Sequence, residues 1–87
     1  MELEQLRAFV AVAEEKSYTR AGERLYMSHS TMSRAVSALE REFGLRLIER
    51  GVHVVGLTSD GEKLYTMAKK LLDMAEELEN KMHESTN

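Results

Sequence analysis

The residues best suited to chemistry lie between Ser28 and Gly44, where serines and arginines recur at helical spacing. Ser28 predicts the beginning of a helix, because a serine hydroxyl accepts a hydrogen bond from a free amide of the first turn. Gly44 predicts its end, because glycine adopts the left-handed conformation without steric cost. One face of this helix collects the polar side chains Ser30, Ser33, Arg34, Ser37 and Arg41.

An arginine among small hydroxyls can approach another polar surface closely. Its guanidinium can pair with the two acceptors of a guanine edge or with a phosphate. The alternative is an ordinary solvated helix face. The serines weigh against this alternative, because serine is a poorer helix former than lysine, glutamate or glutamine. The opposite face carries apolar side chains expected in the core, namely Met32, Val36, Leu39 and Phe43.

A shorter helix is expected just before this one, with Thr19 as its N-cap and its end near Leu25. Gly22 predicts a close approach between helices, since a mid-helix glycine costs up to about 1 kcal/mol relative to alanine. A three-residue turn follows, with Met27 expected in the core. A short helix, a tight turn and a longer helix with a polar outer face are typical of a helix-turn-helix.

In a helix-turn-helix the first helix crosses the phosphate backbone, and the second places its N-terminal residues against base edges. Phosphate contacts are therefore expected at the start of the shorter helix. Base contacts are expected at the start of the longer one. The predicted DNA-contacting residues of the two helices are Thr19, Arg20, Ser28, His29, Ser30, Ser33, Arg34 and Ser37.

Two further segments complete the predicted N-terminal part of the chain, residues 1–57, which we call the head. Residues 3–15 have a helical period, and we expect Ala8 and Val12, off its main apolar face, to form a contact surface for a partner chain. Two β-prone runs, 45–49 and 52–57, flank Arg50-Gly51 and predict a small hairpin, or wing. A buried valine-rich loop is the alternative.

Thr58 is expected to cap a last helix of about 25 residues, which would span roughly 37 Å. Apolar residues recur along it at alternating intervals of four and three, as in a heptad seam. The seam consists of Leu64, Ala68, Leu71, Ala75, Leu78 and Met82. We expect a second copy to cover it in a twofold dimer. The alternative is packing on the first helix of the same chain.

Composition narrows the functional class. The net charge is −3, with eight basic and eight acidic residues in 1–57, so residues 58–87 supply the whole excess and should face away from DNA. The sequence has no cysteine and scatters its histidines at positions 29, 53 and 83, which favours neither an enzyme nor a metal site. No segment reads as a signal peptide or a membrane span, so we expect a cytoplasmic protein.

The sequence resembles the N-terminal domain of LysR-type transcriptional regulators. The matching text includes LRAFVAVAEE (6–15), SYTRAGERL (17–25), Ser28, SR (33–34), LE (39–40), GLRLIER (44–50) and LTSDG (57–61). The resemblance implies a mainly α fold: a winged helix-turn-helix of three helices and a two-stranded wing, then a long linker helix that dimerises antiparallel. It also implies base contacts from His29, Ser30, Ser33 and Arg34, with Arg50 and His53 of the wing near the backbone or minor groove.

This resemblance divides the chain into a DNA-binding domain (1–58), a linker helix (59–83) and a frayed tail (84–87). The helix-turn-helix would occupy about 18–44 and the wing about 45–57. Two positions depart from the family pattern. The family usually has glutamine where this chain has His29, and a wing rich in glycine and arginine where only His53 could carry charge here.

The family's larger effector domain is missing, which suggests an excised fragment, with a truncated natural protein as the alternative. We therefore expect no cofactor, metal or small-molecule effector on these residues. The leading hypothesis is sequence-specific binding of double-stranded DNA by a homodimer. The alternative is a helical dimerisation or protein-interaction module that keeps the fold but has little DNA affinity.

Overall fold

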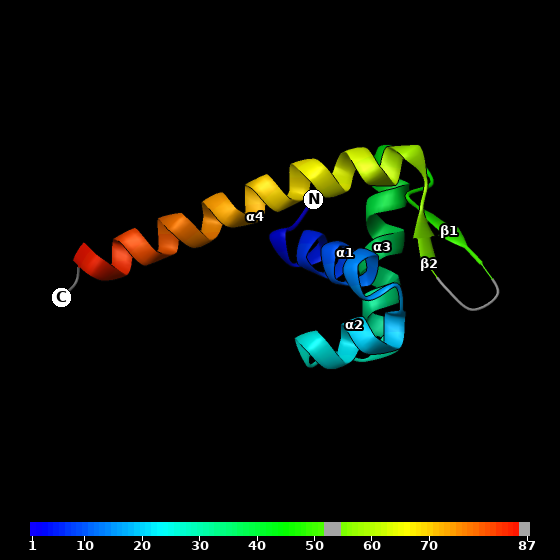
Figure 1. Cartoon of the computed structure of the whole chain (residues 1–87), viewed down its shortest axis with the longest axis horizontal. Helices are drawn as coiled ribbons and strands as arrows, with labels where there is room; N and C mark the ends of the chain where they lie inside the picture. The colour runs from blue at the N-terminus through cyan, green and yellow to red at the C-terminus, as the bar shows by residue number, and fades with distance from the viewer. Residues whose placement is uncertain (52–54, 86–87) are drawn as a thin grey trace.

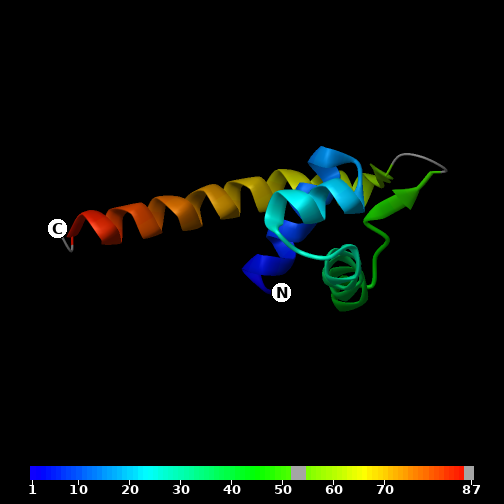
Figure 2. The ribbon, with the colours of Figure 1, turned by 90° about the horizontal axis from the view of Figure 1, so that it is seen from below.

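The computed structural model describes residues 1–51 and 55–85. The chain forms four helices and one antiparallel pair of strands in these residues (Figures 1 and 2). The elements in chain order are α1 (Leu3–Glu15), α2 (Tyr18–Leu25), α3 (His29–Phe43), β1 (Ile48–Arg50), β2 (Val55–Leu57) and α4 (Ser59–Ser85). This is the mainly α, winged helix-turn-helix architecture predicted from the sequence.

Helix α1 lies at the centre of the head and contacts α2, α3 and α4 (Figure 1). Its bounds are those expected. Leu6 and Phe9 are fully buried, and so are Ala8 and Val12. The expectation that these last two residues face a partner chain was wrong. Because α1 is covered by helices on several sides, more of its circumference than one stripe lies in the core.

The N-cap of helix α2 lies two residues earlier than expected. The N-cap is Ser17, whose hydroxyl accepts a hydrogen bond from the Arg20 amide at 3.1 Å. Thr19 is inside the helix and exposed, so the prediction that it caps the helix was wrong. Ser17 takes this role because its backbone is extended, which aims the hydroxyl at the free amides of the first turn.

Gly22 makes the close approach that its position suggested: it faces the backbone of the turn after α2 and, at ordinary contact distance, Met32 of α3. A Cβ at Gly22 would collide with the Met27 carbonyl. The Met27 amide also donates to the Gly22 carbonyl at 2.8 Å. The Met27 side chain is exposed, which corrects the expectation that it lies in the core. The backbone of Met27 packs on α2 at Gly22.

Helix α3 has the predicted ends. The Ser28 hydroxyl accepts from the Thr31 amide at 3.1 Å, and Gly44 ends the helix in the left-handed region with φ of 66°. The apolar residues Met32, Val36 and Leu39 are buried. Phe43, expected beside them, is 41% exposed, because the chain turns away at Gly44 and leaves the last turn of α3 partly uncovered.

The Glu40 carboxylate holds the segment between α3 and the hairpin. It accepts hydrogen bonds from the amides of Leu47 at 2.9 Å and Ile48 at 3.3 Å, and both of these side chains are buried. Strand β1 then pairs antiparallel with β2, with Ile48 opposite Leu57 and Arg50 opposite Val55. The predicted wing is therefore present, with Arg50 inside its first strand rather than in the turn.

Helix α4 begins at the predicted cap. The Thr58 hydroxyl accepts from the Gly61 amide at 3.0 Å and donates to the Arg46 carbonyl at 2.6 Å. The first half of α4 covers the core, and the second half runs beyond the head (Figures 1 and 2). The helix includes Glu84 and Ser85, which were expected to be frayed. No helix in residues 1–51 and 55–85 is long and apolar enough to cross a membrane.

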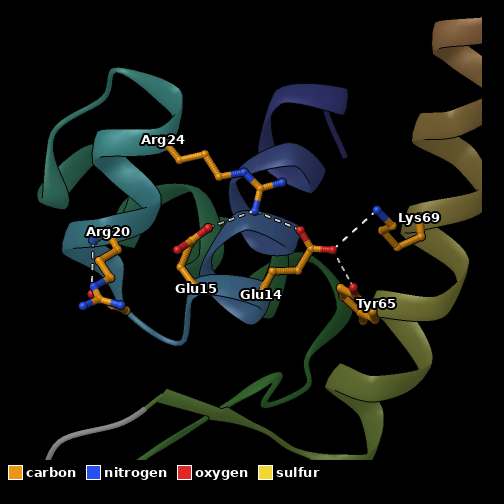
Figure 3. A network of polar contacts seen from close by, with 7 residues as sticks. Glu14, Glu15, Arg20, Arg24, Tyr65 and Lys69 are labelled. Atoms are coloured by element: carbon orange, nitrogen blue, oxygen red, sulfur yellow. Dashed lines mark hydrogen bonds and ion pairs between the residues drawn. The ribbon is translucent and has the colours of Figure 1, made fainter.

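A polar network joins α4 to the head around Glu14 (Figure 3). The Tyr65 hydroxyl donates to the Glu14 carboxylate at 2.6 Å, and Lys69 lies 3.4 Å from the same oxygen. Arg24 of α2 contacts the other oxygen at 2.8 Å. The Tyr65 hydrogen bond, with help from Arg24 and Lys69, lowers the pKa of Glu14 below its ordinary value. One carboxylate thus links α1, α2 and α4.

Candidate nucleic-acid interface

The N-terminal end of α3 points away from α4 and lies beside α2 (Figure 1). In Figure 2 the view runs along α3, with α2 and the hairpin on neighbouring sides. The α4 segment carries the acidic excess of the chain, so this arrangement places the net negative charge on the opposite side from the α3 N-terminus. A polyanion could therefore approach this end of α3 without meeting the acidic helix.

The polar face of α3 is accessible, as predicted. His29, Ser30, Arg34 and Arg41 are exposed, while Ser33 and Ser37 are half-buried. None of these six side chains is in the protein core. The serines leave short side chains around Arg34, so the helix backbone can come near another surface.

The first turns of α3 carry a chain of hydroxyl groups that ends at Arg34. The Ser28 hydroxyl donates to Thr31 Oγ1 at 2.8 Å and lies 3.4 Å from the Ser30 hydroxyl. Arg34 Nη2 donates to the same Thr31 oxygen at 3.4 Å. Thr31 is half-buried, and it was not among the residues predicted for the site. Its spacing of three residues from both Ser28 and Arg34 is the signal that could have identified it.

His29 lies between α2 and the hairpin. Its ring is 5.3 Å from the Tyr18 ring, with an interplanar angle of 56°. Tyr18, His29, Ser33, Gly51 and Val55 line a shallow hollow of about 220 Å³. The hollow brings the starts of both helices next to the ends of the two strands that face the connecting loop of the wing. Tyr18 was also absent from the predicted site, although an aromatic residue at the start of α2 could have drawn attention to it.

Thr19 and Arg20 lie in the first turn of α2 and are both exposed. Arg20 stands apart from the Glu14 network, whereas Arg24 reaches into it (Figure 3). Within the described residues, Arg20 has no side-chain ion pair, while Arg24 pairs with Glu14 and Glu15. Arg20 at the start of α2 and Arg34 near the start of α3 therefore remain available to an anion.

The wing residues are only partly covered by the described structure. The backbone of Arg50 lies in β1 opposite Val55, and its side chain is outside the described part. His53 also lies outside the described residues. The predicted DNA contacts of these two residues remain predictions.

The residues predicted for dimerisation divide into two groups. Leu64 and Ala68 pack on the core of their own chain, as the alternative of intrachain packing required. Leu71, Leu78 and Met82 are exposed, with Leu78 at 62% and Met82 at 58%, and Ala75 is half-buried. Met67 and Met74 extend the exposed apolar stripe. We call this set, Met67, Leu71, Met74, Leu78 and Met82, the α4 stripe.

Among residues 1–51 and 55–85 the structure has no cluster of three acidic, cysteine or histidine side chains that could hold a metal ion. Arg34 and the serines offer hydrogen-bond donors and acceptors rather than a nucleophile with an adjacent base. The chemistry of this surface is that of recognition by hydrogen bonds and charge.

Comparison with known proteins agrees with this interpretation. The family model for bacterial regulatory helix-turn-helix proteins of the lysR family matches residues 3–62. The transcriptional regulator BenM of Acinetobacter baylyi is 42% identical over 78 residues, which are 90% of this chain and 26% of BenM. The uncharacterised regulator YfeR of Shigella flexneri is 46% identical over 71 residues, 82% of this chain and 23% of YfeR. The chain thus spans about a quarter of these relatives.

Solved structures match the whole fold. The BenM DNA-binding domain in complex with catB site 1 DNA has a TM-score of 0.92 and 39% identity, covering 97% of this chain and 93% of that one. The corresponding CbnR–DNA complex has a TM-score of 0.90 and 31% identity, with full coverage of both chains. Full-length OxyR of Pseudomonas aeruginosa has a TM-score of 0.95 and 36% identity, and the match covers 100% of this chain and 30% of OxyR. The chain belongs to the LysR family of bacterial regulatory helix-turn-helix proteins.

Proposed function

We propose that this chain binds duplex DNA sequence-specifically as a homodimer and is the DNA-binding part of a LysR-type transcriptional regulator in the cytoplasm. The observation that carries the proposal is the exposed serine and arginine face of α3, at the end of the head that points away from acidic α4. Its fold also matches relatives whose structures contain DNA. The alternative, an interaction module with little DNA affinity, has no such support.

The contacts follow from the helix-turn-helix geometry. The α3 N-terminus enters the major groove, where Arg34 pairs with a guanine edge or anchors a phosphate, and His29, Ser30 and Ser33 contact neighbouring groups. Thr19 and Arg20 at the start of α2 contact the backbone, which sets the register without reading sequence. Ser28 and Ser37 lie at the edges of this interface. The contacts predicted from the sequence for Arg50 and His53 of the wing belong to the same proposal.

Replacing Arg34 with alanine tests the assignment. Fluorescence anisotropy should be measured on a duplex that the wild-type chain enriches from a random-sequence pool, and on a scrambled duplex of equal length. Loss of a bidentate arginine contact costs about 1–3 kcal/mol of specific binding, roughly five- to 150-fold. Binding to the scrambled duplex should change far less.

Arg41→Ala is the matched control, because Arg41 is exposed on the same face of α3, seven residues further along. It removes the same charge about 10 Å from Arg34 along the helix axis. We expect Arg41→Ala to weaken binding to both duplexes alike and to leave the ratio of the two affinities unchanged. Equal discrimination by Arg34→Ala and wild type would reject the assigned role. Undetectable binding of wild type to any duplex at low salt would reject DNA binding altogether.

We further propose that the α4 stripe is the dimer contact. Exposed leucines and methionines on a projecting helix are stabilised when a second apolar surface covers them. In an antiparallel pair the stripe of each chain covers the other, with the contact centred near Met74, midway between Met67 and Met82. The two heads then lie at opposite ends of the pair, as binding to two half-sites requires.

The chain has no cysteine, so single-cysteine variants report directly on this pairing. We expect Met74→Cys to form a disulfide-linked dimer on mild oxidation. Met82→Cys should not, because in an antiparallel pair the two copies of position 82 are separated by about 24 Å along the axis. Cross-linking at both positions would indicate a parallel pair. A monomer by sedimentation at micromolar concentration would contradict the dimer.

A further inference from the structure

The Thr31 hydroxyl occupies a specific place between the helix cap and the arginine of the recognition face. It accepts from Ser28 at 2.8 Å and from Arg34 at 3.4 Å, while the Thr31 amide donates to Ser28 at 3.1 Å. A hydroxyl oxygen has two lone pairs, so it can accept both hydrogen bonds at once. Thr31 therefore links the Arg34 side chain to the backbone of the first turn of α3.

The direction of each hydrogen bond among Ser28, Ser30, Thr31 and Arg34 follows from the protons that these side chains have available. The single hydroxyl proton of Ser28 goes to Thr31, so in the 3.4 Å contact between Ser28 and Ser30 the donor is Ser30. Both lone pairs of Ser30 then remain open to an incoming donor. Arg34 uses one of its five N–H groups on Thr31 and keeps the others for a ligand.

Thr31 is a more rigid anchor than an exposed side chain would be. It is half-buried and β-branched, so its χ1 angle is restricted in the helix. Arg34 is exposed and would otherwise sample many rotamers. Among the described residues, Thr31 is the one side chain that hydrogen-bonds to Arg34, and no acidic side chain there pairs with it.

We propose that Thr31 is a positioning residue that holds the Arg34 guanidinium in its DNA-reading orientation and thereby determines specificity without touching DNA. The inference rests on the proposed function of Arg34. Holding the guanidinium before binding reduces the conformational entropy lost when the arginine engages its target. The loss of Thr31 should then reduce discrimination between sequences more than it reduces electrostatic attraction to phosphates.

Thr31→Val tests this proposal, because valine keeps the shape and the β-branch and removes the hydroxyl. On the enriched duplex we expect binding to weaken about two- to tenfold, the range for one hydrogen bond. On the scrambled duplex the change should be less than about twofold. Thr31→Ser restores the hydroxyl and should restore discrimination. Thr66→Val on α4, where Thr66 bonds to the Glu62 carbonyl, is the matched control and should leave both affinities unchanged.

A double-mutant cycle separates positioning of Arg34 from a general effect on the helix cap. In an Arg34→Ala background, Thr31→Val should have no further effect on discrimination, because the group that it positions is absent. An undiminished effect in that background would overturn the proposal, and so would wild-type discrimination by Thr31→Val. If Arg34→Ala itself leaves discrimination intact, the proposed function of Arg34 fails first, which is a distinguishable result.

Discussion

The Glu40 carboxylate provides a quantitative test of how the wing is held on the helix-turn-helix. It accepts two backbone hydrogen bonds, from Leu47 at 2.9 Å and from Ile48 at 3.3 Å. Both amides belong to residues whose side chains are buried, in the segment that connects α3 to β1. In Glu40→Ala the two amides lose their acceptor, and the side chain that replaces it is too short to supply another.

The expected magnitude follows from the number and type of these bonds. A hydrogen bond to a charged group contributes about 1.5–3 kcal/mol, and the 3.3 Å bond is the weaker of the two. Because the site is only part-buried, water can partly replace the carboxylate, and we expect a loss of about 2–3 kcal/mol. For a domain of this size that loss lowers Tm by roughly 10–20 °C. Glu40→Gln keeps one acceptor oxygen and should fall between wild type and Glu40→Ala.

Thermal and urea unfolding followed by circular dichroism would measure the change. Hydrogen exchange at the Leu47 and Ile48 amides should also accelerate in Glu40→Ala more than at α1 amides. Glu42→Ala is the matched control, since Glu42 lies on the same helix and pairs with the exposed N-terminal amine. We expect it to change stability far less. Equal losses in Glu40→Ala and Glu42→Ala would refute the reasoning, because charge alone would then explain both.

Two further predictions concern the packing of the head. Gly22→Ala should destabilise the fold by about 1–3 kcal/mol because its Cβ meets the Met27 carbonyl, whereas Gly56→Ala, with open space around it, should be nearly neutral in the same urea titration. Glu14 has a lowered pKa in the folded protein. Its contribution to the free energy of unfolding is therefore present above a pH of about 4.5 and is lost as the pH falls through the folded pKa. Glu14→Gln should therefore be less stable than wild type at pH 7 and lose less stability between pH 5 and pH 3; parallel pH profiles would contradict this.

Local sequence signals were sufficient for most of the secondary structure. Ser28, Gly44 and Thr58 mark helix ends as predicted, because capping depends on one side chain and the few backbone groups next to it. The polar face of α3 was also predictable, since helical geometry alone determines which residues share a face. The two strands were found, but β1 starts three residues later than expected, because pairing with a partner strand sets its limits.

Burial and side-chain partners depended on the tertiary structure. Ala8 and Val12 are buried because α1 is surrounded, whereas Met27 and Phe43 are exposed because the chain turns away from the core beside them. The choice between two nearby N-caps, Ser17 and Thr19, depended on backbone conformation that no local propensity distinguishes.

The sequence by itself determined the helix-turn-helix, its serine and arginine face and the apolar seam of α4. All three depend on helical periodicity and local capping. The tertiary structure alone decided that Glu40 anchors the wing, that Glu14 ties α4 to the head, and which part of the seam stays exposed. Each of these depends on contacts between elements, and such contacts exist only after the helices have packed in three dimensions.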